Sequence, residues 1–315
     1  MLKQISLLIL CAAAIVWFAT PVQACTSAVV SGKVTPDGRP LLWKNRDTDF
    51  MRNHVDYVKG EKYDFIAVVN SVNAYLKEAW MGTNSAGFAL MNTQSYNLVD
   101  VKGDEERGAA NGRVIYRALE VCATVEDFCH FLDTISKPSD IEANFGVIDA
   151  QGGAAMFEVD YYKYAMYDAN NPKDAPYGYI ARTNFSFAGK VNEGAGYVRY
   201  MEADQVLMKA SATGSITPQF IFNDLSRSFR NRMLDIDLRS GAYNRPQASG
   251  WFVDQDFIPR SSTSCSVVVQ GVKPGEKAEL TTMWTLLGYP PTGIAVPLWV
   301  KDAGKLLPGM VRFGK

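Results

Sequence analysis

The sequence predicts an α+β domain in which mainly antiparallel sheets are covered by helices on their outer sides. Short apolar runs separated by turn residues occupy positions 26–91, return over 145–167 and recur near the end over 264–286. Segments whose apolar residues follow helical spacing lie between these blocks. Strands grouped in blocks, instead of alternating one by one with helices, favour an antiparallel layered domain over a parallel sheet.

Residues 1–24 have the pattern of a secretory signal peptide. Lys3 provides a positive charge, an apolar run fills 5–18, and residues 22–24 form a cleavage site that ends in a small residue. The apolar run is short for a membrane span, and an uncleaved anchor is the alternative interpretation. We therefore expect residues 25–315 to form one secreted or periplasmic domain with no stable membrane insertion after cleavage.

Cleavage after Ala24 gives Cys25 both a thiol and a free α-amine. The amine can act as the general base for the thiol, so this nucleophile needs no histidine. The chain has only two histidines, His54 and His130, and we expect His130 to be partly buried in a helix. A lipidated lipoprotein cysteine and a plain structural cysteine are the alternatives, although the bulky Gln23 is unfavourable for lipidation.

The first elements after Cys25 are expected to form a β-hairpin. Strands over 26–32 and 39–43 flank the turn residues Pro36-Asp37-Gly38. Further apolar runs predict strands over 65–70 and 87–91.

Two helices are expected in the middle of the chain. Apolar residues from Val114 to Cys122 follow helical spacing, and Thr124 with Asp127 predicts an N-terminal cap for a second helix that ends at Ile135. The helical segment should therefore break near residue 123. The remaining expected elements are strands over 145–149, 154–159 and 162–167, helices over 200–207 and 217–229, and strands over 264–270 and 280–286.

Charge and cysteine spacing exclude several classes of function. The formal net charge is −1, without a basic field for nucleic acid. Cys122 and Cys129 lie seven positions apart, about 10 Å along a continuous helix, which is too far for a disulfide. The acidic pairs at 235/237 and 254/256 lack a partner pattern that specifies a metal, and we expect no cofactor.

A polar cluster follows the second predicted strand, whose pairing with the first brings it beside Cys25. In the segment from Asn45 to Asp49, Arg46 could stabilise a thiolate, and Asp49 could orient the α-amine as the third group of a triad does. A solvated salt-bridge cluster at a strand end is the alternative.

Three segments resemble the opening of a known superfamily. Cys25-Thr26-Ser27, the turn over 37–42 and Asn45-Arg46-Asp47-Thr48-Asp49 are similar to the N-terminal nucleophile (Ntn) hydrolases related to choloylglycine hydrolase, penicillin V acylase and acyl-CoA:6-aminopenicillanic acid acyltransferase. The resemblance extends over most of residues 25–315. It implies a four-layer αββα sandwich with two mainly antiparallel sheets.

The resemblance also implies roles for individual residues. Arg46 and Asp49 match the Arg-x-x-Asp pattern of the superfamily. By the same resemblance, Asn92 would offer its backbone N–H, and Asn184 its side chain, to the oxyanion. Arg199 matches the second active-site arginine.

The function implied is hydrolysis of a linear amide bond in a small N-acyl amide through a Cys25 thioester. Alternatives are an acyltransferase or dipeptidase with the same nucleophile, and a non-catalytic envelope lipoprotein. The short interval between Asn184 and Arg199 argues against bile salts as substrates. Aromatic residues such as Phe185, Phe187, Trp251 and Phe252 could line an acyl pocket, or could pack in the core. The sequence is compatible with a monomer and with a homo-oligomer.

Overall fold

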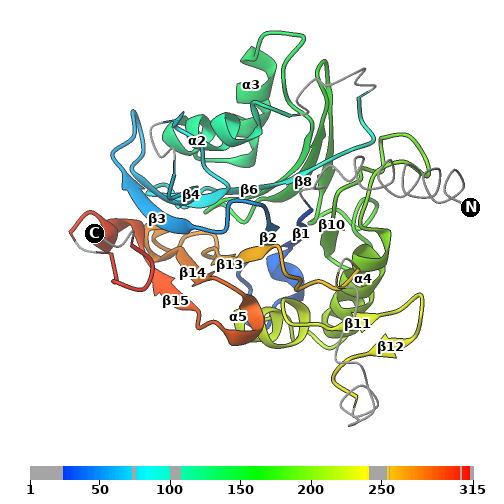
Figure 1. The fold of residues 1–315 in the computed structure, drawn as a ribbon. Helices are drawn as coiled ribbons and strands as arrows, with labels where there is room; N and C mark the ends of the chain where they lie inside the picture. The colour runs from blue at the N-terminus through cyan, green and yellow to red at the C-terminus, as the bar shows by residue number, and fades with distance from the viewer. Residues whose placement is uncertain are drawn as a thin grey trace, which may run out of the picture.

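Two antiparallel sheets lie face to face, and helices cover the outer side of each (Figure 1). This arrangement confirms the predicted α+β sandwich with layers in the order αββα. Among the described residues, no helix has the length and apolar content needed to cross a membrane. The predicted signal peptide, apart from Ala24, lies outside the described residues. The computed structural model describes residues 24–72, 76–99, 108–240, 254, 256–305 and 307–312.

The first sheet has six strands in the order β10-β1-β2-β13-β14-β15. The hairpin of β1 and β2 is the one predicted from the sequence, with Ala28 opposite Trp43. Because β1 lies between β10 and β2, the residues that follow Cys25 are held on both sides. The strands are β1 (Thr26–Val30), β2 (Leu41–Asp47), β10 (Tyr179–Arg182), β13 (Thr263–Gln270), β14 (Thr282–Leu287) and β15 (Val296–Leu298).

The second sheet is a seven-stranded meander in which spatial order follows chain order. A separate two-stranded ribbon lies later in the chain. The meander consists of β3 (Asn53–Val58), β4 (Phe65–Asn70), β5 (Met81–Asn84), β6 (Ala89–Gln94), β7 (Ala143–Ile148), β8 (Ala154–Val159) and β9 (Tyr164–Asp168), and the ribbon of β11 (Arg230–Asn231) and β12 (Ile236–Asp237).

Helices form the two outer layers (Figure 1). Helices α2 (Asn111–Val121) and α3 (Val125–Thr134) cover the seven-stranded sheet. Helix α4 (Tyr197–Ala212), with α5 (Pro218–Phe220) and the π-helix η3 (Ile221–Leu225), covers the six-stranded sheet. The short remaining helices are η1 (Gly32–Val34), η4 (Ala278–Leu280), η5 (Pro290–Thr292) and α6 (Val300–Ala303).

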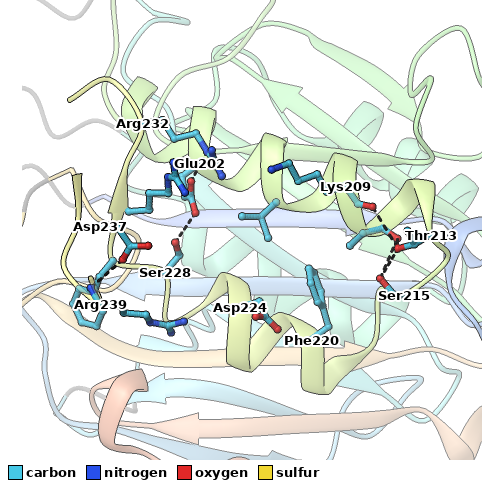
Figure 2. A pocket seen from close by; sticks show the side chains of 14 residues that line it. Glu202, Lys209, Thr213, Ser215, Phe220, Asp224, Ser228, Arg232, Asp237 and Arg239 are labelled. Carbon is cyan, nitrogen blue, oxygen red and sulfur yellow. Dashed lines mark hydrogen bonds and ion pairs between the residues drawn. The ribbon is translucent and has the colours of Figure 1, made fainter. Parts of the chain in front are cut away.

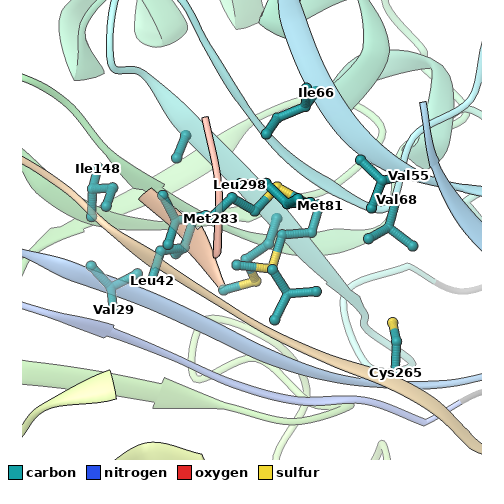
Figure 3. Packing of buried hydrophobic residues seen from close by; sticks show 14 of the residues in the cluster. Val29, Leu42, Val55, Ile66, Val68, Met81, Ile148, Cys265, Met283 and Leu298 are labelled. Carbon is teal, nitrogen blue, oxygen red and sulfur yellow. The ribbon is translucent and has the colours of Figure 1, made fainter. Parts of the chain in front are cut away.

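A layer of buried apolar side chains separates the sheets (Figure 3). Val29 of β1 and Leu42 of β2 belong to this layer, whereas their neighbours Ala28 and Trp43 pack on the opposite face with α4. Strand side chains alternate between faces, so this pattern fixes the direction of every residue on β1 and β2. Odd positions of β1 and even positions of β2 face the space between the sheets.

Several predicted elements are confirmed. β4 and β8 have the bounds that the apolar patterns predicted. Thr124 and Asp127 form a capping box at the start of α3, and α2 is capped by Cys122, so the helical segment breaks near residue 123. The cysteines of the described residues, Cys25, Cys122, Cys129 and Cys265, are all free thiols.

Three predictions about local structure are wrong. The second strand continues beyond Trp43 to Asp47, because the polar side chains that follow Trp43 are buried among polar partners and do not mark a strand end. The helix expected over 217–229 ends at Leu225, and the chain then enters β11. His130 lies on the solvent side of α3 and is exposed.

Candidate active site

Cys25 directly precedes β1 and is buried, with 7 % of its surface exposed. Its Sγ lies 3.9 Å from the backbone oxygen of Asp47, a weak S–H···O contact. Ser27 and Val29 share its parity along the strand, and Val29 faces the space between the sheets. The alternation therefore directs the Cys25 side chain toward the second sheet.

Two cations on β2 lie on the same side of the sheet as the thiol. Thr26 is opposite Asn45 in the β1–β2 ladder, so continuing this register places Cys25 opposite Arg46. Lys44 is two positions away from Arg46 and faces the same way. Two positively charged side chains therefore lie on the face of the sheet toward which the Cys25 thiol points.

Arg46 is fixed by partners from the second sheet. Its guanidinium donates hydrogen bonds to the side-chain oxygens of Asn53 and Asn70, the second at 2.9 Å, and lies 4.6 Å from the centre of the Trp80 ring. Burial lowers the pKa of Arg46, and the thiols of Cys265 and Cys25 act in the opposite direction. The sequence analysis expected Arg46 near Cys25 but after the end of the second strand, whereas the structure places it within β2.

Lys44 was missed by the sequence analysis, although it shares its face of β2 with Arg46. Its Nζ donates to Oδ1 of Asn92 at 2.9 Å and to the backbone oxygen of Trp80 at 3.1 Å. Burial lowers the pKa of Lys44, and the Cys25 thiol opposes that shift. Lys44 thus links the sheet that follows Cys25 to Asn92 on β6 of the other sheet.

The acidic residue beside Cys25 is Asp47. Asp49 lies beyond the end of β2 and is exposed, so the structure does not bring it to Cys25 as expected. Asp47 is buried, and its carboxylate accepts hydrogen bonds from Arg260 Nε at 2.9 Å and Thr263 Oγ1 at 2.6 Å. The same Arg260 donates through Nη2 to the backbone oxygen of Ala24 at 3.0 Å.

The ionisation of Asp47 reflects opposing influences. Burial raises the pKa of its carboxyl, whereas the Arg260 guanidinium and the Thr263 hydroxyl favour the ionised form. Lys44 and Asp47 are three residues apart, as are Arg46 and Asp49, and lie two positions earlier in the chain than that pair. A predicted strand that extended past Trp43 would have included both Lys44 and Asp47.

Arg199 connects Cys25 to Asn184. From α4 its Nη1 donates to the Cys25 backbone oxygen at 2.6 Å and to Thr26 Oγ1 at 2.8 Å, while Nη2 donates to Asn184 Oδ1 at 2.9 Å. Burial lowers the pKa of Arg199 to about 10, which still leaves the guanidinium charged at neutral pH. Because Oδ1 accepts from Arg199, the amide nitrogen of Asn184 points away from it, and one of its hydrogens bonds Gln94 O at 2.8 Å.

Five of the six predicted site residues are therefore buried around the N-terminus of β1. These are Cys25, Arg46, Asn92, Asn184 and Arg199. Asn92 uses its side-chain oxygen to bind Lys44, and the donation by its backbone N–H to an oxyanion stays a prediction.

A separate cavity of about 400 Å³ lies between α4, η3 and the ribbon (Figure 2). Its buried Glu202 accepts a hydrogen bond from Ser228 at 2.5 Å and pairs with Arg232 at 2.6 Å. This cavity lies on the helix-covered face of the six-stranded sheet. The Cys25 thiol faces the other sheet, so the cavity is not the site of its chemistry.

A matched pair of substitutions tests which carboxylate serves the site. Asp47→Asn should lower the free energy of unfolding by about 3 kcal/mol, because it breaks the buried ion pair with Arg260, and should also slow the expected amide hydrolysis. Asp49→Asn changes an exposed side chain and should shift stability by less than about 0.5 kcal/mol with turnover unchanged. Urea denaturation and steady-state rates measure both effects. Loss of turnover in Asp49→Asn alone would restore the sequence-based assignment.

Comparison with known proteins identifies the family. The model of the acyl-coenzyme A:6-aminopenicillanic acid acyl-transferase family matches residues 34–211, more than half of the 315 residues. The chain belongs to this family. None of the curated proteins matches the sequence.

The chain is also similar to solved structures. A variant of conjugated bile acid hydrolase from Clostridium perfringens aligns with a TM-score of 0.51 and 12% identity over 87% of this chain and 92% of that chain. Penicillin V acylase from Agrobacterium tumefaciens gives 0.43 and 15% identity over 84% and 82%. A Caenorhabditis elegans ortholog of N-acylethanolamine-hydrolyzing acid amidase gives 0.42 and 18% identity over 64% and 89%. The match to the bile acid hydrolase shows that the protein has the Ntn-hydrolase fold.

Proposed function

We propose that the protein is a secreted or periplasmic amidohydrolase that cleaves small N-acyl amides with Cys25 as its N-terminal nucleophile. The observation that carries the proposal is the Arg199 clamp. One buried guanidinium binds both the Cys25 backbone and the Asn184 amide, so the thiol and a hydrogen-bond donor for an oxyanion are held together. Removal of residues 1–24 is part of the proposal, because it frees the α-amine.

In the first half of the reaction, the α-amine takes the proton of the Cys25 thiol, and the sulfur attacks the amide carbonyl carbon. The positive charges of Lys44 and Arg46 attract the negative sulfur, and the buried Asp47 carboxylate balances the positive charge of the α-ammonium. The oxyanion accepts hydrogen bonds from the Asn184 side chain and the Asn92 backbone, and one such donor is worth about 3 kcal/mol in the transition state. The C–N bond then breaks, and the leaving amine takes the proton from the α-ammonium.

In the second half, water attacks the thioester carbonyl while the α-amine accepts its proton. The C–S bond breaks, the carboxylic acid leaves, and the proton returns to the Cys25 sulfur. A second amine in place of water would complete an acyl transfer. The description of the matched family as an acyl-transferase favours this as the second candidate function.

The experiment is a substrate panel with the mature protein, after its N-terminal residue has been verified as Cys25. N-acyl amino acids, penicillin V, conjugated bile salts and dipeptides are incubated with and without an added amine acceptor. We expect release of free amine from at least one N-acyl amide. Acyl product on the added amine would assign the transferase, and an inert protein with a verified free N-terminus would contradict the proposal.

A further inference from the structure

The cavity between α4, η3 and the two-stranded ribbon has both charged and apolar walls (Figure 2). Its volume of about 400 Å³ falls within the roughly 300–1,000 Å³ of small-molecule sites. It lies on the helix-covered side of the six-stranded sheet, away from the Cys25 thiol. A molecule bound there would therefore not be a substrate of that thiol.

One end of the cavity carries charges of both signs. Arg230 and Arg232 reach it from the ribbon, and Glu202 reaches it from α4. The Glu202 carboxylate is buried, with Oε2 2.6 Å from Arg232 Nε, and Asp237 and Arg239 line the same end (Figure 2). The whole lining is nearly balanced in charge, with four basic and three acidic side chains: Lys209, Arg230, Arg232 and Arg239 against Glu202, Asp224 and Asp237.

This charged end has hydrogen-bonding capacity to spare. Within the described part of the chain, Nε of Arg230, Nε of Arg232 and Oε2 of Glu202 are buried without a hydrogen-bond partner. The ion pair brings two of these atoms close together without the angles of a hydrogen bond. Because buried polar atoms are nearly always hydrogen-bonded, three of them at one cavity indicate a partner from outside the chain. The Arg230 side chain is 40% exposed, so it can rotate to present its N–H groups.

The cavity becomes apolar along α4. Val206 and Ala210 follow Glu202 at intervals of four residues, and all three line the cavity. Residues four apart lie on one stripe of a helix, about 6 Å from one to the next along its axis. Phe220 faces this stripe from α5, and its ring points toward α4 (Figure 2). A charged end is therefore followed by an apolar channel.

The ribbon side of the cavity is held in place before any ligand binds. Arg239 Nη2 donates to the backbone oxygens of Arg227 at 2.7 Å and Asn223 at 3.2 Å, which joins the end of the ribbon to η3. The backbone N–H of Leu238 donates to the Phe229 oxygen at 3.1 Å. A site whose walls are already fixed loses little conformational entropy when a ligand binds.

We propose that this cavity binds a small zwitterion with an apolar body, which is the chemistry of a free apolar amino acid. Its carboxylate lies against the guanidinium groups of Arg230 and Arg232. Its ammonium lies against the carboxylates of Glu202 and Asp237, and its side chain extends along Val206. A simple anion would meet the two carboxylates and a simple cation the two guanidinium groups, so only a ligand with both charges suits the nearly balanced lining. The proposal does not depend on amidase activity, because no atom of Cys25 takes part.

The test is isothermal titration calorimetry of the mature protein with four matched probes. L-leucine has both charges and an apolar body. 4-Methylpentanoate lacks its ammonium, 3-methylbutylamine lacks its carboxylate, and glycine lacks its apolar body. We expect saturable binding of L-leucine and at least about tenfold weaker binding of each other probe, because each loses a charged hydrogen bond or a buried aliphatic group.

Two variants locate the binding. Arg230→Gln removes one guanidinium, whose ion-pair partner Asp235 is itself exposed, and Val206→Trp fills the channel. Each should weaken L-leucine binding by about tenfold or more. Arg113→Gln is the matched control, since Arg113 is a half-exposed arginine on α2 that pairs with Glu78 at 3.7 Å, and it should bind L-leucine as the wild type does.

Urea denaturation verifies that each variant is folded, and Arg230→Gln decides the outcome if Val206→Trp is not. Absence of binding by L-leucine would overturn the proposal. So would 4-methylpentanoate or 3-methylbutylamine that binds as tightly as L-leucine, because the site would then recognise a single charge. Unchanged L-leucine affinity in folded Arg230→Gln would place the binding elsewhere and also overturn it.

Discussion

Cys25→Ala should reduce amide turnover by about 10⁴-fold or more, because it removes the only atom that forms the covalent intermediate. The fold should survive, since a small side chain at the start of a strand is shortened by one atom. The clamp from Arg199 binds the backbone oxygen of Cys25 and its neighbour Thr26, so it is unaffected. Steady-state rates and urea denaturation on the processed variant measure the two effects.

Cys122→Ala is the matched control for this substitution. Cys122 is a second buried free thiol, but it packs with α2 on the outer side of the seven-stranded sheet. We expect its replacement to leave turnover unchanged. Equal rates for the wild type and Cys25→Ala, with the N-terminus verified in both, would remove Cys25 from the mechanism.

A chain that keeps even one residue before Cys25 should lose activity by about 100-fold or more. The Cys25 nitrogen is then an amide without a basic lone pair, and general acid–base catalysis of this kind contributes about 10²–10⁴-fold. In the unprocessed chain, Arg260 binds the Ala24 backbone oxygen at 3.0 Å. The rate of amide turnover is measured for a protein that carries a cleavable N-terminal extension before Cys25, and again after a protease has removed the extension.

Removal of the extension should restore the rate, which controls for damage to the fold. Full activity of the verified extended form would show that another group acts as the base. His54 would then be reconsidered. It lies on β3 with Nδ1 3.1 Å from the Ser71 hydroxyl. Burial lowers its pKa, so the imidazole is uncharged near pH 7 and could accept a proton.

Local patterns predicted much of the fold because many strands bury alternating or continuous apolar residues. β4 and β8 are such strands, and the Thr124 capping box is a purely local signal. β10 escaped prediction because Tyr179–Arg182 is short and pairs with β1, about 150 residues earlier. Its place in the sheet depends on long-range contacts that no local window contains.

The site residues that local sequence signals mark were predicted, and those that depend on long-range contacts were not. Cys25 is singled out in the sequence by the predicted cleavage site before it, and the structure places it at the start of β1 beside Arg46. Polar residues after Trp43 predict a strand end and direct attention to Asp49, but Lys44 through Asp47 are buried and paired within β2, and Asp49 is exposed beyond it. Burial of a charged strand depends on partners such as Arg260 and Asn92, which lie far away in sequence.

The most direct test of the central claim is the mass of the covalent intermediate. The mature protein is mixed with an N-acyl amide that it cleaves, quenched in acid within the first turnover and mapped by peptide mass spectrometry. The account predicts that the acyl mass is carried by a peptide whose first residue is Cys25, through a thioester that hydroxylamine removes. An acyl group on any other residue, or on Cys25 in a chain whose nitrogen is still joined to Ala24, would contradict it.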